Sequence, residues 1–146
     1  MNKKGFTLIE LLAIIVILAV IALIGTPIVT NIINTTRKNA AERTCDSVVK
    51  EMNNVYGLVS LEDQDVETVT VTFNGSTVTT QKKLAGKTDL EAVTGDSVFA
   101  MSQTKPTAGV ISISRTTGGS NATWGDLTVN GYTCKYDTTA ARYKCS

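Results

Sequence analysis

The stretch that decides the fold is KKGFTLIELLAIIVILAVIALIG, residues 3–25. Every residue from Leu11 to Ile24 is apolar, and the run is long enough to cross a bilayer as a helix. The two lysines that precede it place the N-terminus on the cytoplasmic side. Glu10 does not fit this pattern, because a carboxylate in hydrocarbon costs about 2 to 4 kcal/mol on insertion scales.

Two ordinary interpretations of this segment fit its hydropathy. A secretory signal peptide would have the same basic start and apolar run, with a cleavage site after Ala22. A plain membrane anchor is the second interpretation. Neither requires Glu10, and neither explains why a helical pattern continues beyond the span.

That pattern is one apolar stripe with spacings of one, three and four residues, and charged residues fill the positions between its members. The membrane segment and the amphipathic segment are therefore expected to form one helix from about Phe6 to about Val59. Gly25 and Pro27 interrupt it, and a bend is expected there because proline lacks an N–H and clashes with the preceding turn. The stripe consists of Ala41, Cys45, Val48, Val49, Met52, Val55, Tyr56 and Val59.

The motif KGFTLIELL resembles the class III signal of type IV pilins and the related pseudopilins, and the resemblance covers residues 1 to about 55. It implies that residues 1–5 are a leader peptide, which prepilin peptidase removes by cleaving between Gly5 and Phe6. The new N-terminus at Phe6 would then be N-methylated. Thr7 matches the motif as well, and the position of Pro27 matches the helix-bending proline of the family.

The resemblance also implies a role for Glu10. In the family this glutamate is thought to meet the N-terminal amine of a neighbouring subunit, so Glu10 would pair with the Phe6 amine of the next chain. Such a pair offsets much of the cost of burying a lone carboxylate. Glu10 would then be unsatisfied in the isolated subunit and satisfied in the polymer. The alternative is that Glu10, one turn inside the span, snorkels or is protonated near the headgroups.

The residues after the helix predict a small antiparallel β-head. Asn74-Gly75 is a favoured pair for a type I′ hairpin turn, which would place Phe73 opposite Ser76 and Glu67 opposite Lys82. Alternation puts one set of residues on a face that covers the helix stripe and leaves a threonine face outside. The covering set is Val69, Val71, Phe73 and Val78; the outer set is Thr68, Thr70, Thr72, Thr77 and Thr79.

The acidic run LEDQDVE, residues 61–67, is expected to end the helix between Val59 and Leu61, because negative charge is unfavourable at a helix C-terminus. Its oxygen ligands could suit calcium, but a solvated loop is the favoured interpretation. Residues 85–97 are interpreted as a loop and 116–120 as a turn. Further strands are expected at 97–101, 109–115, 124–130 and 131–137, with a tight turn at Asn130-Gly131.

The final hairpin is expected to align Cys134 with Cys145 and Tyr136 with Tyr143, with residues 138–141 as its loop. A short disulfide across such a hairpin is geometrically allowed. The resemblance supports a Cys134–Cys145 bond, because many pilins close a C-terminal loop with a disulfide.

The third cysteine, Cys45, lies on the apolar stripe and is expected to be a buried free thiol. A bond from Cys45 to either C-terminal cysteine is the alternative, and it would join the helix to the sheet. The chain has three Cys and no His, and no CxxC pair occurs, so no metal site and no cofactor are predicted.

The resulting expectation is an α+β pilin fold with four parts: a leader (1–5), a transmembrane or filament-core helix (6–30), its amphipathic half (31–61) and an antiparallel β-sheet head (62–146). The expected function is that of a structural subunit, a major pilin of a type IV pilus filament. It would start in the cytoplasmic membrane as a precursor and end in an extracellular cell-surface filament. The sequence does not distinguish among motility, adhesion and DNA uptake as the role of that filament. Its partners would be its own copies, prepilin peptidase and the membrane assembly machinery.

Three alternatives remain open. A minor pilin, or a pseudopilin of a type II secretion or DNA-uptake system, shares the same signal. A membrane-tethered surface binding domain would not polymerise, and a secreted enzyme would be cut after Ala22. Catalysis is not predicted, since no nucleophile–base set and no phosphate loop occur in the sequence. A net charge of +1 gives no field for a specific nucleic-acid partner.

Overall fold

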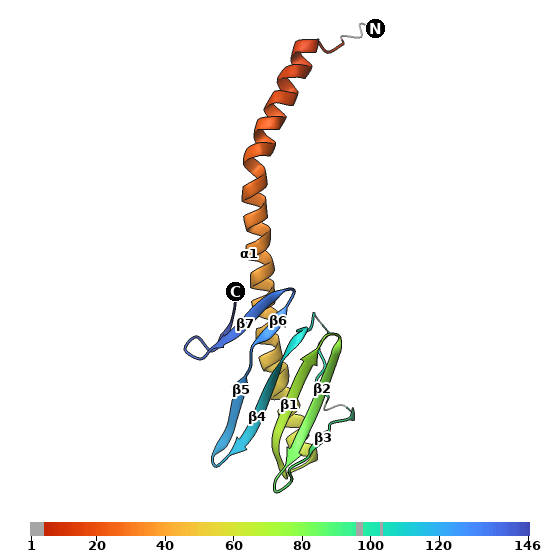
Figure 1. Cartoon of the computed structure of the whole chain (residues 1–146), viewed down its shortest axis with the longest axis vertical. Coiled ribbons are helices and arrows are strands. Elements are labelled where there is room, and N and C mark those ends of the chain that lie inside the picture. Colours follow the sequence, from red (N-terminus) through yellow and green to blue (C-terminus); the bar gives the residue numbers. More distant parts are fainter. Residues whose placement is uncertain (1–4, 96–97, 103) are drawn as a thin grey trace. The chain divides into compact units, whose positions relative to one another are not determined.

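The structure, a computed structural model, describes residues 5–95, 98–102 and 104–146. It has the expected α+β organisation, in which one long helix, α1 (Leu8–Glu62), packs on an antiparallel sheet (Figure 1). The chain divides into two compact units, one ending at Thr36 and one running from Arg37 to Ser146. Only the C-terminal part of α1 belongs to the unit that contains the sheet.

α1 begins at Leu8, two residues later than the sequence suggested, and continues through Gly25 and Pro27 without a break in its helical assignment. The Thr26 hydroxyl donates a hydrogen bond of 2.7 Å to the carbonyl oxygen of Ala22, one turn before it. Hydroxyls that bond back in this way are a common feature next to prolines in apolar helices. The bend expected at Gly25 and Pro27 stays a prediction.

The helix ends at Glu62, one residue beyond the expected limit. The amide of Asp63 continues the hydrogen-bonding pattern by donating to the carbonyl oxygen of Val59, at 2.9 Å. The Asp63 carboxylate is 3.1 Å from the ammonium of Lys82, so a cation offsets the negative charge at this helix end. The acidic run therefore starts inside the last turn instead of after it.

The predicted apolar stripe of the helix is confirmed. The side chains at its centre are buried against the sheet, while Val49 and Tyr56 at its margins are partly buried. Spacings of three and four residues keep these side chains on one side of α1, which is why they meet a single sheet face. The buried members are Ala41, Cys45, Val48, Met52, Val55 and Val59, and Thr44, which was not part of the predicted stripe, is buried beside them.

Within the described residues, eight strands form one antiparallel sheet in the order β3-β2-β1-β4-β6-β7-β8, with β5 paired to β4. β4 pairs with β1 along one edge and with β6 and then β5 along the other. The bounds are β1 (Val66–Asn74), β2 (Thr77–Leu84), β3 (Leu90–Ala92), β4 (Ala108–Thr116), β5 (Gly119–Trp124), β6 (Leu127–Val129), β7 (Tyr132–Asp137) and β8 (Arg142–Cys145).

The register of the first hairpin differs from the prediction. Asn74 pairs with Thr77 and Phe73 with Val78, so the two turn residues are Gly75 and Ser76 instead of Asn74 and Gly75. Gly75 has a φ of 61° and stands at the first turn position, where a type II′ turn requires glycine. The predicted inner and outer faces of the hairpin are unchanged. A shift of the turn by one residue moves the pairing partners by two residues, and side chains two residues apart lie on the same face.

The shifted register also changes the expected ion pair. Glu67 does not face Lys82; its carboxylate lies 2.9 Å from the ammonium of Lys83, next to a bulge between Val66 and Thr68. Lys82 instead pairs with Asp63, as described above.

Several strand predictions need correction. The segment expected as a loop, 85–97, contains the short strand β3. β5 occupies residues that were expected to be a turn and a connection, together with Trp124, and the strand expected at 124–130 is reduced to β6. Residues 98–101 are irregular instead of extended, and Ser97, which was predicted to begin that strand, lies outside the described residues. Phe99 is nevertheless buried, with its ring edge-on to Phe73 at a centroid distance of 5.4 Å. Its burial explains why an apolar segment is present without a strand.

The end of the chain folds as predicted. Asn130 and Gly131 form a two-residue turn, both with positive φ, as a type I′ turn requires. In the last hairpin Cys134 pairs with Cys145 and Tyr136 with Tyr143, and residues 138–141 form the loop.

Candidate functional site

The first site is the N-terminal segment, where Gly5 and Phe6 precede the helix and are exposed. Thr7 is the N-cap of α1. Its backbone N–H and its hydroxyl each donate a hydrogen bond of 2.8 Å to Oε2 of Glu10, and the Glu10 N–H lies 3.3 Å from the Thr7 hydroxyl oxygen. Together these contacts form a capping box, in which the side chains at the N-cap and three residues later satisfy each other's amides.

The capping box corrects one expectation about Glu10. Its carboxylate was expected to be unsatisfied in the isolated subunit, but Thr7 already provides two donors to one of its oxygens. The sequence signal for this contact was present, since a threonine followed three residues later by a glutamate is the capping-box pattern. Among the hydrogen bonds of the described residues, none reaches the other oxygen, Oε1. Glu10 is thus held in place with one oxygen available.

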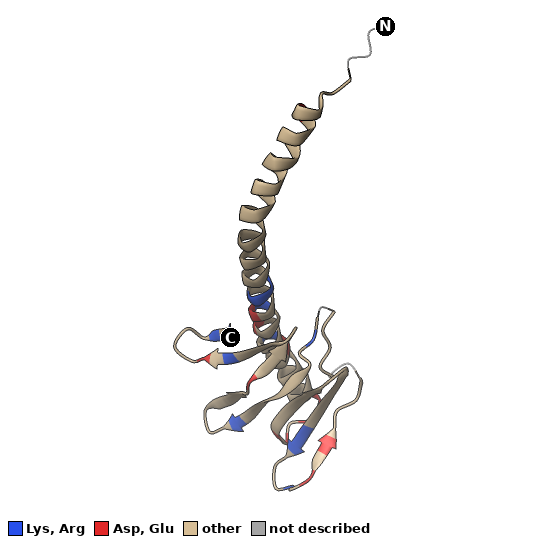
Figure 2. Ribbon diagram, turned by 45° about the horizontal axis from the view of Figure 1, so that its top comes forward, with Lys and Arg blue, Asp and Glu red and all other residues tan. Residues whose placement is uncertain are grey.

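The apolar part of α1 presents its side chains outward. By length and composition α1 can cross a membrane, and large apolar residues from Leu8 to Ile33 are exposed around the whole helix in the unit that ends at Thr36. Figure 2 shows that charged residues gather on the head and the adjoining turns of the helix. An exposed apolar surface of this size requires lipid or protein contacts.

A second group of residues joins α1 to the C-terminal strand. Two carboxylates one turn apart on the helix, Glu42 and Asp46, accept hydrogen bonds from the backbone of β8. The Cys145 N–H lies 3.1 Å from Oε1 of Glu42, and the Tyr143 N–H lies 2.9 Å from Oδ1 of Asp46. Because β8 is an edge strand, these amides have no neighbouring strand, and the helix supplies their acceptors instead. The sequence pattern did not reveal this contact, because it placed both residues only among the charged positions between the apolar ones.

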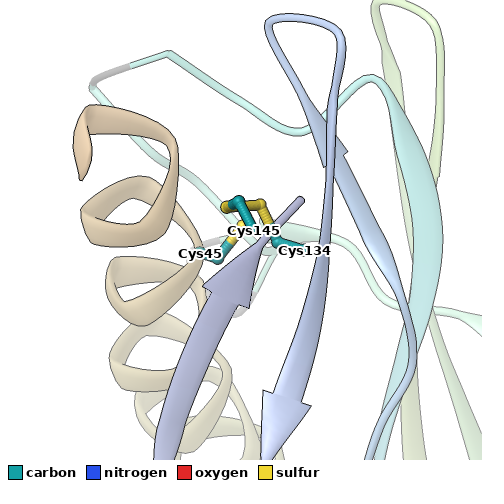
Figure 3. Close-up of side chains that lie close together, drawn as sticks. All are labelled: Cys45, Cys134 and Cys145. Atoms are coloured by element: carbon teal, nitrogen blue, oxygen red, sulfur yellow. A yellow bond between two sulfur atoms is a disulfide. The ribbon is translucent and has the colours of Figure 1, made fainter. Parts of the chain in front are cut away.

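The three cysteines converge beside these carboxylates. Cys134 and Cys145 form a disulfide across the β7–β8 hairpin, and Cys45 on α1 is a buried free thiol (Figure 3). All three sulfur atoms lie within 4.8 Å of one another. Burial, with added repulsion from Asp46 and Glu42, raises the pKa of the Cys45 thiol to about 12. Cys45 is therefore protonated at neutral pH.

The sulfur cluster is also the group of described side chains whose ligand atoms lie close enough together to hold a metal ion. Two of its three sulfurs are bonded to each other, so a soft metal could bind only after reduction. The acidic run considered for calcium is different: Asp63 and Glu67 are each paired with a lysine. The hydrogen bond from Lys82 lowers the pKa of Asp63.

Comparison with known proteins identifies the N-terminal segment. A family model described as the prokaryotic N-terminal methylation motif matches residues 1–26. Searches of curated proteins and of solved structures found no significant match. The motif is the class III signal of type IV pilins, and it supports a pilin-like or pseudopilin precursor that prepilin peptidase processes at the membrane. Residues 1–26 of this chain therefore carry the N-terminal methylation motif of type IV pilin-like precursors.

Proposed function

We propose that this protein is a filament subunit of the type IV pilus class and acts as a major pilin. The observation that carries the proposal is the exposed apolar part of α1, most of which lies within the matched methylation motif and which contains one held carboxylate, Glu10. A membrane anchor needs only the apolar surface. A polymer core needs the same surface together with a polar group that fixes the register between chains.

Processing would occur between Gly5 and Phe6, with methylation of the Phe6 amine. The local structure supports this site, since residues 5–7 are not helical and the side chain of Phe6 is 83% exposed. A peptidase must bind an extended backbone, and the helix that begins at Leu8 leaves these residues accessible. The family that carries this motif is structural, and we propose no catalytic activity for the chain.

Assembly would use Glu10 and Thr7 together. Thr7 holds Oε2 of Glu10, and Oε1 would accept the charged Phe6 amine of the next chain. A carboxylate can accept several hydrogen bonds, so both contacts can exist at once. The capping box would then preorganise the carboxylate for its partner, and removal of Glu10 would disturb both the cap and the pair.

The parts of the chain would follow from this role. Residues 1–5 would be the leader, 6–30 the filament core with a bend at Gly25 and Pro27, 31–61 the amphipathic half and 62–146 the surface-exposed head. The precursor would sit in the cytoplasmic membrane, and the mature chain would form an extracellular filament stabilised by heterologous contacts between copies. The Cys134–Cys145 bond would persist in the oxidising environment outside the cell and would stabilise the end of the head against unfolding.

The test is mass spectrometry of material sheared from the cell surface, digested without reduction. An abundant chain that begins at N-methylated Phe6, with Cys134 linked to Cys145, is the expected result. The same chain in trace amounts would indicate a minor pilin or a pseudopilin. A chain that retains Met1 and is found only in membranes would contradict the proposal and favour a tethered binding domain. A chain in the medium that begins after Ala22 would contradict it in favour of a secreted protein.

A further inference from the structure

The three sulfur atoms have an arrangement that the polymer interpretation does not use. Cys45 comes from the helix, Cys134 from β7 and Cys145 from β8, and the three side chains point toward one another (Figure 3). All three are buried, with Cys145 the most exposed at 4%. A reagent in solvent has little access to these sulfurs, so the partner within reach of each is another member of the cluster.

We propose that Cys45, Cys134 and Cys145 form an internal thiol–disulfide exchange site, through which the chain moves its disulfide from the hairpin to a bond between helix and sheet. The thiolate of Cys45 attacks one sulfur of the Cys134–Cys145 bond. A bond from Cys45 to that sulfur forms, the original bond breaks, and the other cysteine leaves as a thiolate that takes up the proton Cys45 lost. One disulfide and one thiol are present before and after, so no oxidant or reductant is required.

The two states differ in what they constrain. The hairpin bond links residues 11 apart in the sequence, in strands that are already paired. A bond from Cys45 would tie α1 covalently to β7 or β8 and close a far longer segment of chain, which in the chain-entropy model restricts the unfolded state more. Exchange would therefore replace a disulfide within one hairpin by a disulfide between the helix and the end of the head.

The surroundings of Cys45 slow the exchange at neutral pH. Burial and the charges of Asp46 and Glu42 on α1 disfavour the thiolate, and Tyr143 of β8, itself in contact with Tyr136 of β7, also faces the cluster. With a pKa of about 12, the thiolate fraction at pH 7 is on the order of 10⁻⁵. Exchange should thus be slow and should accelerate about tenfold for each unit of pH.

The first experiment uses the oxidised full chain in detergent micelles. Samples held at pH 7 to 10 are denatured in acid with N-ethylmaleimide, and peptide mapping shows which cysteine carries the label. The label should lie on Cys45 at pH 7 and move to Cys134 or Cys145 as the pH rises, at a rate independent of protein concentration. The denatured chain, held at pH 10, is the positive control, because its label should be distributed over all three cysteines. A label that stays confined to Cys45 in the folded chain at pH 10 would overturn the proposal. So would a rate equal to that of global unfolding.

Two sets of variants sharpen the test. Glu42→Gln and Asp46→Asn keep an acceptor oxygen for β8 but remove the charge near Cys45, so each should speed exchange severalfold at a fixed pH. Glu51→Gln, on the same helix but outside the cluster, should leave the rate unchanged. An equal effect of all three changes would contradict the mechanism.

The second set removes one sulfur at a time. In a glutathione redox buffer, Cys145→Ser should form a Cys45–Cys134 bond, and Cys134→Ser a Cys45–Cys145 bond. Two free thiols in both folded variants would show that the sulfur of Cys45 cannot reach its neighbours, and the proposal would fail.

Discussion

The backbone N–H of Tyr143 donates a hydrogen bond of 2.9 Å to the carboxylate of Asp46, 97 residues earlier in the chain. The carboxylate of Glu42, one turn earlier on the helix, accepts a hydrogen bond of 3.1 Å from the Cys145 N–H. Carboxylates at positions i and i+4 thus take the place of a missing strand along the free edge of β8. Covering an edge in this way prevents unwanted pairing with another chain, a particular hazard for a protein that we propose is packed at high density in a filament.

Removal of one of these acceptors should weaken the head. We expect Asp46→Ala to lower the free energy of unfolding by about 1–3 kcal/mol, because the Tyr143 amide is left without its acceptor. Asp46→Asn should cost less, since an amide oxygen can still accept the bond. Urea titration of the detergent-solubilised chain measures both, with Glu51→Ala as a control on the same helix. Equal losses for Asp46→Ala and Glu51→Ala would show that the contact to β8 contributes little.

The disulfide should contribute a comparable amount. In the chain-entropy model, a link between residues 11 apart is worth about 2–3 kcal/mol. The double variant Cys134→Ser/Cys145→Ser is the suitable test, because a single change leaves a partner for Cys45. Its midpoint in urea should fall by the corresponding amount, and reduction of the parent chain should give a similar shift. An unchanged midpoint in both would mean that the β7–β8 pairing alone holds this end of the sheet.

The crossing from β5 to β6 depends on a close approach of two backbones. A Cβ at Gly125 would overlap the carbonyl oxygen of Val110, whereas a Cβ at Gly119 would meet nothing within 4 Å. We expect Gly125→Ala to destabilise the head by about 1–3 kcal/mol or more, because backbone cannot move aside as a side chain can. Gly119→Ala should change stability by less than about 0.5 kcal/mol. Thermal unfolding of the two variants makes the comparison, and similar melting temperatures would contradict it.

Acid should loosen the last hairpin through Asp137. Its carboxylate accepts a hydrogen bond of 2.6 Å from Lys144 and further bonds from the amides of Ala140 and Thr139, and these lower its pKa from 3.8 to about 2. A lowered pKa stabilises the fold above about pH 4, and this contribution is lost as the pH falls toward 2.

The Lys144→Met variant isolates this effect. It removes the main cause of the shift, so its melting temperature should fall less between pH 5 and pH 2.5 than that of the parent. Lys135→Met is the control, because the ammonium of Lys135 forms a longer ion pair, of 3.6 Å, with the Asp126 carboxylate. If the two variants respond alike to acid, Asp137 is not the group responsible.

The sequence predicted the features that depend on local periodicity. The stripe of α1 and the register of the β7–β8 hairpin are of this kind, because side-chain spacing and turn residues specify them directly. The predicted turn of the first hairpin was wrong by one residue. Asn74-Gly75 and Gly75-Ser76 are both suitable residue pairs for a primed turn. In the structure the turn is at Gly75-Ser76, and the other edge of β1 pairs with β4, a contact that periodicity does not reveal.

Contacts between distant segments were the least predictable. The bonds from β8 to Glu42 and Asp46, and the approach of Cys45 to the disulfide, depend on how the sheet lies on the helix. Their residues look like an ordinary charged helix surface and a buried cysteine when the sequence is considered alone. The capping box is the exception, since Thr7 and Glu10 are three residues apart and the pattern could have been recognised.

The role of Glu10 can be separated from its cap by three substitutions. Glu10→Val removes both the capping contacts and the charge, and we expect the subunit to remain in the membrane without normal filaments. Glu10→Gln keeps an oxygen for Thr7 but cannot form a charged pair with the Phe6 amine, so it should also impair assembly. Thr7→Ala removes the cap, at a cost of about 1 kcal/mol to the helix end, but retains the carboxylate.

The three variants are compared by counting sheared filaments from cells with equal amounts of subunit in the membrane. Impaired assembly in Glu10→Gln together with normal filaments in Thr7→Ala would assign the effect to charge pairing. Glu10→Gln loses the charge but keeps an oxygen for the cap, whereas Thr7→Ala loses the cap but keeps the charge. Normal filaments from Glu10→Gln and none from Thr7→Ala would assign it to the capping box instead, and the pairing role would be refuted.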